Sequence, residues 1–312
     1  MTGSDDDGMI SGRGLSKTYR GGRRPALDNV SLRVQAGEIL GVIGPNGSGK
    51  TTLMSCLLGL LRPDQGEARV GGFPVAGIPA RSLVGYLPER LGFDRWMKGS
   101  DFLAYHHALA GQPASDRSGD VEAMLTDVGL ERAAWSRPIR GYSRGMLQRI
   151  GMAQALIGKP RCLFLDEPTS GMDPDGVLQT RARIQAFAAS GGAVVINSHQ
   201  LDQLGKLCHH VLFLKEGRLE AHQRLQGGAG LSWFVEWLAK EGVASKAKAV
   251  LDKLGLEGAR LAKSTARVDV ADEEAAAALV AAMVKAGVPV LAAGPVKGDL
   301  ERFFTGAAHA GE

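Results

Sequence analysis

The stretch that decides the fold is Gly44-Pro45-Asn46-Gly47-Ser48-Gly49-Lys50-Thr51-Thr52, which directly follows the short apolar segment Glu38–Ile43. Its spacing is G-x-x-x-x-G-K-[ST], in which the glycines let the backbone approach phosphate groups closely. We expect the backbone N–H groups of 46–51 to form an anion-binding nest at the start of a helix. Lys50 would then reach the outer phosphates, and Thr51 would offer its hydroxyl to Mg²⁺. A chance glycine turn is disfavoured, because an apolar strand precedes the motif and a helix with an apolar face, 50–61, follows it.

A second apolar strand, Cys162–Leu165, ends in the acidic pair Asp166-Glu167. We expect Asp166 to hold Mg²⁺, directly or through water, and Glu167 to act as the general base for an attacking water. A positioned base typically contributes about 10²–10⁴-fold to a rate. Acidic pairs after strands are common on surfaces, so this pair becomes informative only together with the phosphate-binding loop.

Strands alternate with helices along the first two thirds of the chain, which predicts a parallel sheet. Residues 91–157 are expected to be mostly helical, with breaks at 111–119 and 137–145. The other expected strands lie within 10–34 and at 38–43, 83–87, 162–165, 193–197 and 211–214; the other expected helices lie at 50–61, 181–189 and 201–208.

After a glycine-rich linker at 226–230 the pattern starts again. The order strand, helix, strand, strand, helix, strand predicts a small ferredoxin-like α+β domain. These elements are expected at 231–238, 245–254, 260–263, 266–270, 271–286 and 288–292.

Composition excludes several classes of protein. The net charge is only +4 and no long basic run is present, so nucleic-acid binding is not expected. The three cysteines lie in apolar segments without metal-type spacing, which indicates reduced thiols in a cytosolic protein. The first eight residues are too polar for a signal peptide, and no stretch approaches 18 consecutive apolar residues. Any membrane span would therefore come from another chain.

The 43 glycines are about twice the usual share, and position rather than abundance identifies the functional ones.

Five motifs in this order resemble those of the ATP-binding-cassette (ABC) ATPases, over roughly residues 10–225. The resemblance implies an α/β fold: a RecA-like parallel-sheet core with an antiparallel β subdomain and an inserted helical subdomain at about 91–157. The ATP-binding domain would span 9–225 and the C-terminal α+β domain 231–306. The motifs are the phosphate-binding loop, Tyr142-Ser143-Arg144-Gly145-Met146, Asp166-Glu167, Ser170-Gly171-Met172-Asp173 and His199.

The resemblance also implies roles for individual residues, with ATP and Mg²⁺ as cofactors. Tyr19 would stack on adenine, and His199 would contact the γ-phosphate and orient Glu167. The implied catalytic residues are Glu167, His199, Lys50 and Glu89; the implied Mg²⁺ contacts are Thr51, Asp166 and Glu89; the implied nucleotide contacts are Tyr19, Gly44, Pro45, Asn46, Gly47, Ser48, Gly49, Lys50, Thr51, Thr52, Ser143, Gly145 and Asp173.

Several of these positions have structural alternatives. The signature loop of the family is usually Leu-Ser-Gly-Gly-Gln, and this chain keeps only Ser143 and Gly145 of it. Ser143 is alternatively a plain helix cap, and Asp173 a turn aspartate before a proline. Glu89 stands where most members carry glutamine, and is alternatively a surface glutamate. Tyr19 is alternatively a core or hairpin tyrosine.

The resemblance implies a head-to-tail homodimer that closes around two ATP-Mg and drives a separately encoded transmembrane permease, with this chain peripheral on the cytoplasmic face of the inner membrane. The ending Asp299–Gly306 is similar to that of exporter-type members. A groove near Glu89–His107, with Phe93, Trp96, Met97 and Phe102, would receive the permease. The alternatives are a non-transport ABC ATPase of DNA repair or translation, and an ATP sensor without turnover.

Metal binding by the pairs His106-His107 and His209-His210 is disfavoured, because adjacent side chains point to different faces.

Overall fold

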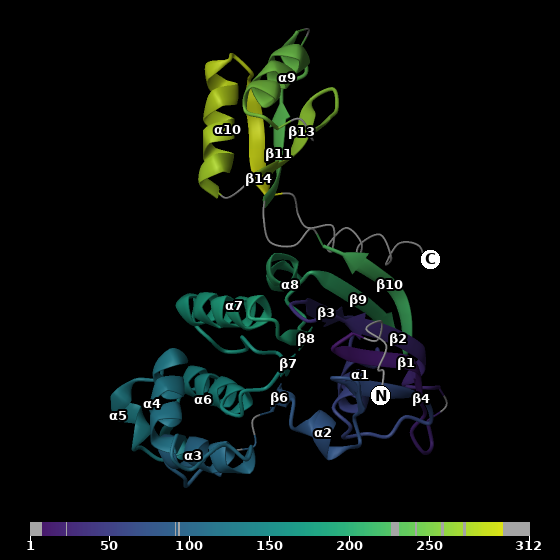
Figure 1. The fold of residues 1–312 in the computed structure, drawn as a ribbon. Helices are drawn as coiled ribbons and strands as arrows, with labels where there is room; N and C mark the ends of the chain where they lie inside the picture. The colour runs from purple at the N-terminus through teal and green to yellow at the C-terminus, as the bar shows by residue number, and fades with distance from the viewer. Residues whose placement is uncertain are drawn as a thin grey trace. The chain divides into compact units, whose positions relative to one another are not determined.

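Five parallel strands and one antiparallel strand form the central sheet of the protein, which we describe from a computed structural model (Figure 1). The structure describes residues 8–22, 24–90, 92, 94–225, 231–240, 242–256, 259–270 and 273–295. The strand order is β10-β9-β3-β8-β7-β6, with β10 antiparallel to β9. The strands are β3 (Ile39–Ile43), β6 (Val84–Leu87), β7 (Cys162–Asp166), β8 (Ala193–Asn197), β9 (His210–Lys215) and β10 (Arg218–Arg224).

The central strands are continuous apolar runs because the sheet is covered on both faces. Every residue of β3, β7 and β8 is buried. The registers β3–β8 and β7–β8 are parallel, so the carboxyl ends of these strands lie along one edge of the sheet. The loops that follow them therefore meet at that edge, where ligands bind in open α/β sheets.

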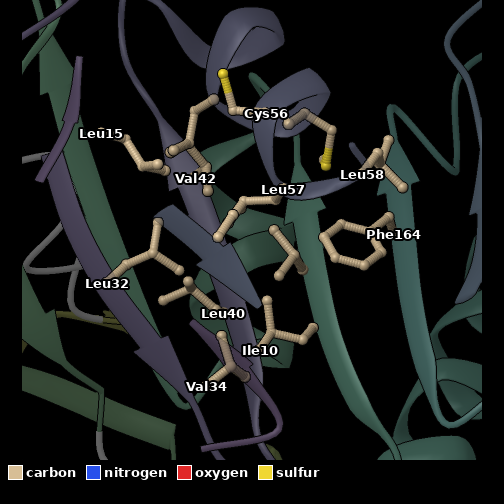
Figure 2. Packing of buried hydrophobic residues seen from close by; sticks show 14 of the residues in the cluster. Ile10, Leu15, Leu32, Val34, Leu40, Val42, Cys56, Leu57, Leu58 and Phe164 are labelled. Atoms are coloured by element: carbon tan, nitrogen blue, oxygen red, sulfur yellow. The ribbon is translucent and has the colours of Figure 1, made fainter. Parts of the chain in front are cut away.

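An antiparallel sheet forms the second layer, in the order β2-β1-β4-β5. The helix α1 (Lys50–Leu57) packs among residues of both sheets: Leu57 and Cys56 contact a cluster that includes Leu15 of one sheet and Leu40 of the other (Figure 2). The strands of this layer are β1 (Ile10–Lys17), β2 (Leu27–Val34), β4 (Gln65–Val70) and β5 (Phe73–Pro74).

The remaining helices of this part of the chain include a helical subdomain between β6 and β7. It comprises α3 (Gly99–Leu109), α4 (Arg117–Asp127), α5 (Arg132–Trp135), the 3₁₀ turn η1 (Ile139–Gly141) and α6 (Arg144–Leu156). Outside it lie α2 (Ile78–Arg81), α7 (Pro174–Ala189) and α8 (Leu201–Leu207). Among the described residues, no helix is both long and apolar enough to cross a membrane.

A second unit has its own sheet, in the order β12-β13-β11-β14, and its own core. Val235 and Trp237 of β11 face the same cluster as Leu251 of α9 and Leu279 of α10, so both helices cover one face of the sheet. This is the ferredoxin-like order of elements. They are β11 (Leu231–Trp237), α9 (Val243–Lys253), β12 (Arg260–Leu261), β13 (Thr265–Val270), α10 (Glu273–Lys285) and β14 (Val290–Pro295).

The described residues of 1–200 and 207–225 form one compact unit, and those of 201–206 and 226–312 form the other. The α/β fold class expected from the sequence is confirmed. The linker expected at 226–230 and the ending Asp299–Gly306 lie outside the described residues.

The helix expected at 50–61 is shorter, because it ends in a left-handed glycine. Gly59 has φ 67°, its N–H donates to Cys56 O, and the Leu60 N–H donates to Ser55 O. This pair of bonds is the Schellman motif, which terminates helices. Leu61 therefore lies beyond the helix.

The helix expected at 181–189 is longer, and three strands were not predicted. α7 begins at Pro174, because Asp173 caps it and proline suits the first helical position. β5 is an edge strand whose two residues are exposed, and the first three residues of β4 are exposed as well, so neither strand has an apolar signal. β10 follows a tight turn, with positive φ at Glu216 and Gly217, that begins a hairpin.

Candidate active site

The loop between β3 and α1 is built on glycines that no other residue replaces without strain. Gly49 has φ 107°, and a Cβ there would lie 2.3 Å from Ala26 O. Gly47 has φ 80° but open space around it. The Gly217 N–H donates to Ser48 O at 3.0 Å, so the β9–β10 turn supports the loop from behind. The nest predicted for the backbone N–H groups of 46–51 would lie here, where the loop leads into α1. The Ser48 N–H donates within the loop, to Pro45 O.

Two side chains in this loop fit a phosphate ligand. The Ser48 hydroxyl is buried and has no hydrogen-bond partner among the described residues. The Lys50 ammonium donates to Gly44 O at 2.7 Å and to Pro45 O at 3.0 Å, so it lies across the mouth of the loop. Burial lowers the pKa of Lys50, while Glu167 and Asp166 act in the opposite direction. An anion at this place would favour the charged form of the lysine.

Asp166 closes the carboxyl end of β7, and its charge is poorly compensated. Burial raises its pKa, and the nearby carboxylates Glu89 and Glu167 raise it further, while Asn197 and Lys50 act in the opposite direction. The Asn197 amide donates to Asp166 Oδ1 at 2.6 Å. A cation would relieve the repulsion among these carboxylates.

Glu167 is held from several sides in a left-handed backbone conformation, with φ 51°. Such a conformation costs about 1–3 kcal/mol and persists only where the surroundings determine it. Its N–H donates to Asn197 O. Its carboxylate accepts from Ser198 Oγ at 3.1 Å and from the His199 N–H at 2.9 Å, and His199 Nδ1 lies 2.7 Å from Oε1. The His199 side chain remains 73% exposed, so the ring can also reach a ligand.

The other predicted residues of this group lie at its rim. Tyr19 is 51% exposed, and its hydroxyl lies 3.3 Å from Thr52 Oγ1, which places the ring beside the start of α1. Glu89 is exposed after β6 and acts electrostatically on Asp166. Thr51 is exposed at the mouth of the loop.

A second group contains Ser143, Gly145 and Asp173. Ser143 caps α6 by accepting from the Met146 N–H at 3.3 Å, and Asp173 caps α7 by accepting from the Gly176 N–H at 3.2 Å. The structural alternatives for these two residues therefore hold in the single chain. A Cβ at Gly145 would lie 4.0 Å from Gly171 O, so the two loops are neighbours. No hydrogen bond or ion pair joins Ser143 or Asp173 to the phosphate-binding loop among the described residues.

Three residues that support the site were not predicted from the sequence. Gln148 is buried and donates to Glu167 O and Pro168 O, Asn197 orients Asp166, and Gly217 supports the loop at Ser48. The only signals in the sequence were a polar residue on the buried face of a helix and another at the end of a buried strand.

The donors present fit Mg²⁺ bound together with a nucleotide. Thr51 and Asp166 offer a hydroxyl and a carboxylate, and Mg²⁺ usually takes one or two protein ligands and completes its shell with phosphate and water. Among the described residues, no three His, Cys, Asp or Glu side chains group closely enough to hold a metal by themselves.

Comparison with known proteins agrees with this geometry. A family model described as ABC transporter matches residues 27–170. An uncharacterized ABC transporter ATP-binding protein of Nostoc sp. is 39% identical over 225 residues, covering 70% of this chain and 67% of the relative. The doxorubicin resistance ATP-binding protein DrrA of Mycobacterium tuberculosis is 33% identical, covering 68% of this chain and 65% of the relative. The chain thus spans about two thirds of the length of these two relatives.

Solved structures show the same fold. The ATP-binding subunit of an ABC transporter matches with a TM-score of 0.65 and 23% identity, covering 87% of this chain and 99% of that chain. The cassette MJ0796, solved as a dimer in a post-hydrolysis state bound to ADP and Pi, matches with a TM-score of 0.65 and 22% identity, covering 70% of this chain and 100% of that chain. With the matching family model and the curated relatives, these findings show that the chain belongs to the ABC transporter ATP-binding proteins and carries an ABC ATPase domain.

Proposed function

We propose that this chain is the ATP-hydrolysing subunit of an exporter, which works as a head-to-tail pair and drives a separate transmembrane permease. The observation that carries the proposal is the arrangement at the ends of β3, β7 and β8. There Lys50, the Asp166-Glu167 pair and His199 converge beside a loop with an orphaned buried hydroxyl.

The chemistry is phosphoryl transfer to water, in which positioning and charge stabilisation supply most of the catalysis. Glu167 orients the water and accepts its proton, while Ser198 and His199 fix the carboxylate. Lys50 and the loop N–H groups bind the β- and γ-phosphates. Mg²⁺, held by Thr51 and Asp166, would neutralise charge on the phosphate oxygens.

Glu167→Gln tests the role of the base. The amide keeps the shape but cannot accept a proton, so we expect kcat to fall at least about 10²-fold, with ATP binding retained. The control Glu122→Gln removes a surface carboxylate of α4 and should leave kcat unchanged. Unchanged turnover in Glu167→Gln would contradict the assignment.

The head-to-tail pair is supported by the separation of the candidate residues into two groups. Ser143 and Gly145 make no hydrogen bond to the phosphate-binding loop of their own chain among the described residues, and we propose that they serve that of a second copy. Glu167→Gln with ATP-Mg should elute as a dimer in size-exclusion chromatography, and with ADP as a monomer. The same elution with both nucleotides would contradict an ATP-dependent dimer.

The permease contact is proposed at the surface around Trp96. Its indole is 73% exposed and lies under the Arg140 guanidinium, 4.5 Å from the ring centroid. Met97 is half-buried beside it. The expectation that Phe102 lines this groove is wrong, because Phe102 is only 5% exposed and packs inside the helical subdomain. Phe93 lies outside the described residues.

Charge substitutions test this surface. Trp96→Asp and Met97→Asp should abolish recruitment to membranes that contain the permease and leave ATP binding intact, because a desolvated carboxylate is costly in an apolar contact. Leu60→Asp, at a residue 69% exposed elsewhere in the fold, is the matched control. Recruitment of both variants at the wild-type level would place the contact elsewhere.

Export rather than import, and a peripheral place on the cytoplasmic face of the inner membrane, are the finer parts of the proposal. They are supported by the Tyr-Ser-x-Gly-Met signature and by the similarity to DrrA, whose name refers to doxorubicin resistance. A non-transport ATPase would show turnover that no permease stimulates. Stimulation by a co-purified membrane subunit is therefore the decisive measurement.

A further inference from the structure

Arg144 of the signature loop contacts the loop that follows Glu167. Its Nη2 donates to Ser170 Oγ at 2.7 Å. The stem of the same side chain lies against Gly171, where an added Cβ would come within 2.3 Å of Arg144 Cδ and Nε. Gly171 also has φ 74°, so both its backbone conformation and this close approach require glycine.

Gln148 makes the companion contact from the same face of α6. Residues four apart on a helix are neighbours on its surface. The Gln148 amide is buried and donates to Glu167 O at 3.1 Å and to Pro168 O at 2.9 Å. Arg144 and Gln148 therefore hold the segment 167–171 at its two ends.

This segment determines where the base lies. The Ser170 N–H donates to Glu167 O at 3.1 Å, which closes a tight turn immediately after the strained residue. A change at Ser170 is thus transmitted to the backbone of Glu167 through a single hydrogen bond. The position of this backbone sets the position of the Glu167 carboxylate, which accepts hydrogen bonds from Ser198 and His199.

The placement of Arg144 is not explained by the stability of α6. It is the first residue of the helix, and a cation there opposes the helix dipole. Among the described residues, its guanidinium has no carboxylate within ion-pair distance, and Ser170 is its polar partner. The family's usual residue at this position is glycine, which makes no such contact.

We propose that Arg144 is a positioning residue for ATP hydrolysis: it connects the first turn of α6 to the turn after Glu167, so that signature loop and general base move together. The inference rests on the proposed role of Glu167. In a head-to-tail pair the signature loop serves one ATP site and Glu167 the other, so the contact couples the two sites.

A double-mutant cycle on the full chain tests this, with Arg144→Ala, Ser170→Ala and the double variant. We expect each single variant to lower kcat about five- to tenfold, as for loss of a charged hydrogen bond that orients a catalytic group, with KM for ATP unchanged. The double variant should be no slower than either single variant, because both remove the same contact. Arg144→Lys should recover most of the rate, since an ammonium also donates to a hydroxyl. Arg132→Ala, an exposed arginine of α5, is the matched control.

Amide hydrogen exchange gives a readout that does not depend on turnover. In Arg144→Ala without nucleotide, the Ser170 amide should exchange faster, while the amides of β7 stay protected. The thermal midpoint of each variant shows whether it is folded.

Three outcomes would overturn the proposal. If the two fold-losses in kcat multiply in the double variant, Arg144 and Ser170 have independent roles. A normal kcat in Ser170→Ala with a low kcat in Arg144→Ala would mean that Arg144 acts directly on the nucleotide. Unchanged Ser170 exchange in Arg144→Ala would mean that the contact does not hold the turn. If Glu167→Gln retains turnover, the proposed function itself fails, which is a separate result.

Discussion

Some residues at this site are held by several hydrogen bonds, and others have a buried polar atom without a hydrogen-bond partner. Glu167 is strained, but its carbonyl and carboxylate accept hydrogen bonds from α6 and from the loop after β8, and its N–H donates to Asn197 O of β8. Ser48 Oγ and Asn197 Oδ1 are buried without partners among the described residues. Buried unsatisfied polar atoms are rare and point to function. The protein thus fixes the carboxylate proposed to act on water and leaves two buried polar atoms near it without a protein partner.

The glycines of the phosphate-binding loop give a residue-scale prediction with an internal control. Gly47→Ala and Gly49→Ala both place a side chain at positive φ, which costs about 1–2 kcal/mol. Only Gly49→Ala also drives a Cβ into backbone, at Ala26 O. We expect Gly49→Ala to lose binding of a fluorescent ATP analogue and to destabilise the fold more than Gly47→Ala in urea unfolding. Equal losses of binding and stability in the two variants would show that the close approach of Gly49 to Ala26 O has no effect.

The three thiols give a prediction about pH. Burial raises the pKa of Cys56 to about 11 and of Cys162 to about 12, and raises that of Cys208 strongly, from the ordinary 9.0. Because the neutral thiol is favoured in the folded chain, this contribution to stability is complete below pH 9 and is lost as the pH rises toward the folded values. Ellman's reagent at pH 8 should label no thiol in the native protein and three after unfolding. Fast labelling of the native chain would contradict the burial.

At the scale of elements, the site exists because parallel strands end along one edge. β3, β7 and β8 each deliver one motif there, and each was recognisable in the sequence as an apolar run, which leads into a glycine-rich loop after β3 and into polar residues at the ends of β7 and β8. The helix α1 then carries Lys50 into the site while its other face packs between the two sheets (Figure 2). Packing of α1 therefore positions Lys50, the lysine proposed to bind phosphate.

Leu57 and Leu60 test whether packing of α1 stabilises this part of the fold, since they are three residues apart and one is buried while the other is exposed. Leu57 is fully buried in the core, and Leu57→Ala should lower the free energy of unfolding by about 2–5 kcal/mol. Leu60 is exposed after the helix has ended, and Leu60→Ala should change it by less than about 0.5 kcal/mol. Urea denaturation measures both values. A similar loss at the two positions would mean that α1 continues past Gly59.

The sequence predicted the elements whose signal is local and missed those fixed by tertiary contacts. The strand at Cys162–Asp166 was predictable from its apolar run alone, and its acidic pair became informative together with the phosphate-binding loop. β4 has no apolar periodicity, because Gln65, Gly66 and Glu67 are exposed and pairing with β1 makes it a strand. Gln148 was missed for the same reason: its amide matters only because the turn after β7 lies against α6.

At the scale of the whole molecule, the described residues include two hydrophobic clusters that share no residue. One is built from residues between Ile10 and Leu214, and the other from residues between Val235 and Val288. The first cluster packs α1 between two sheets, and the second packs α9 and α10 against one sheet. The residues proposed for ATP, from Tyr19 to His199, all belong to the first unit.

Removal of residues 226–312 should therefore leave ATP binding intact, because the truncation deletes one core and no proposed ATP contact. The cut is placed after Leu225 so that β10 and the residues 201–206 remain in the chain. We expect the Kd of a fluorescent ATP analogue to stay within about threefold of the full chain, as for separate domains. The longer truncation at residue 215 removes β10 and the Glu216-Gly217 turn, whose N–H donates to Ser48 O, so it should lose binding. If the first truncation also loses binding, the ATP-binding unit does not fold independently. The loss would then have to be traced to contacts made by residues 226–312, and domain boundaries at 225 and 231 would be wrong.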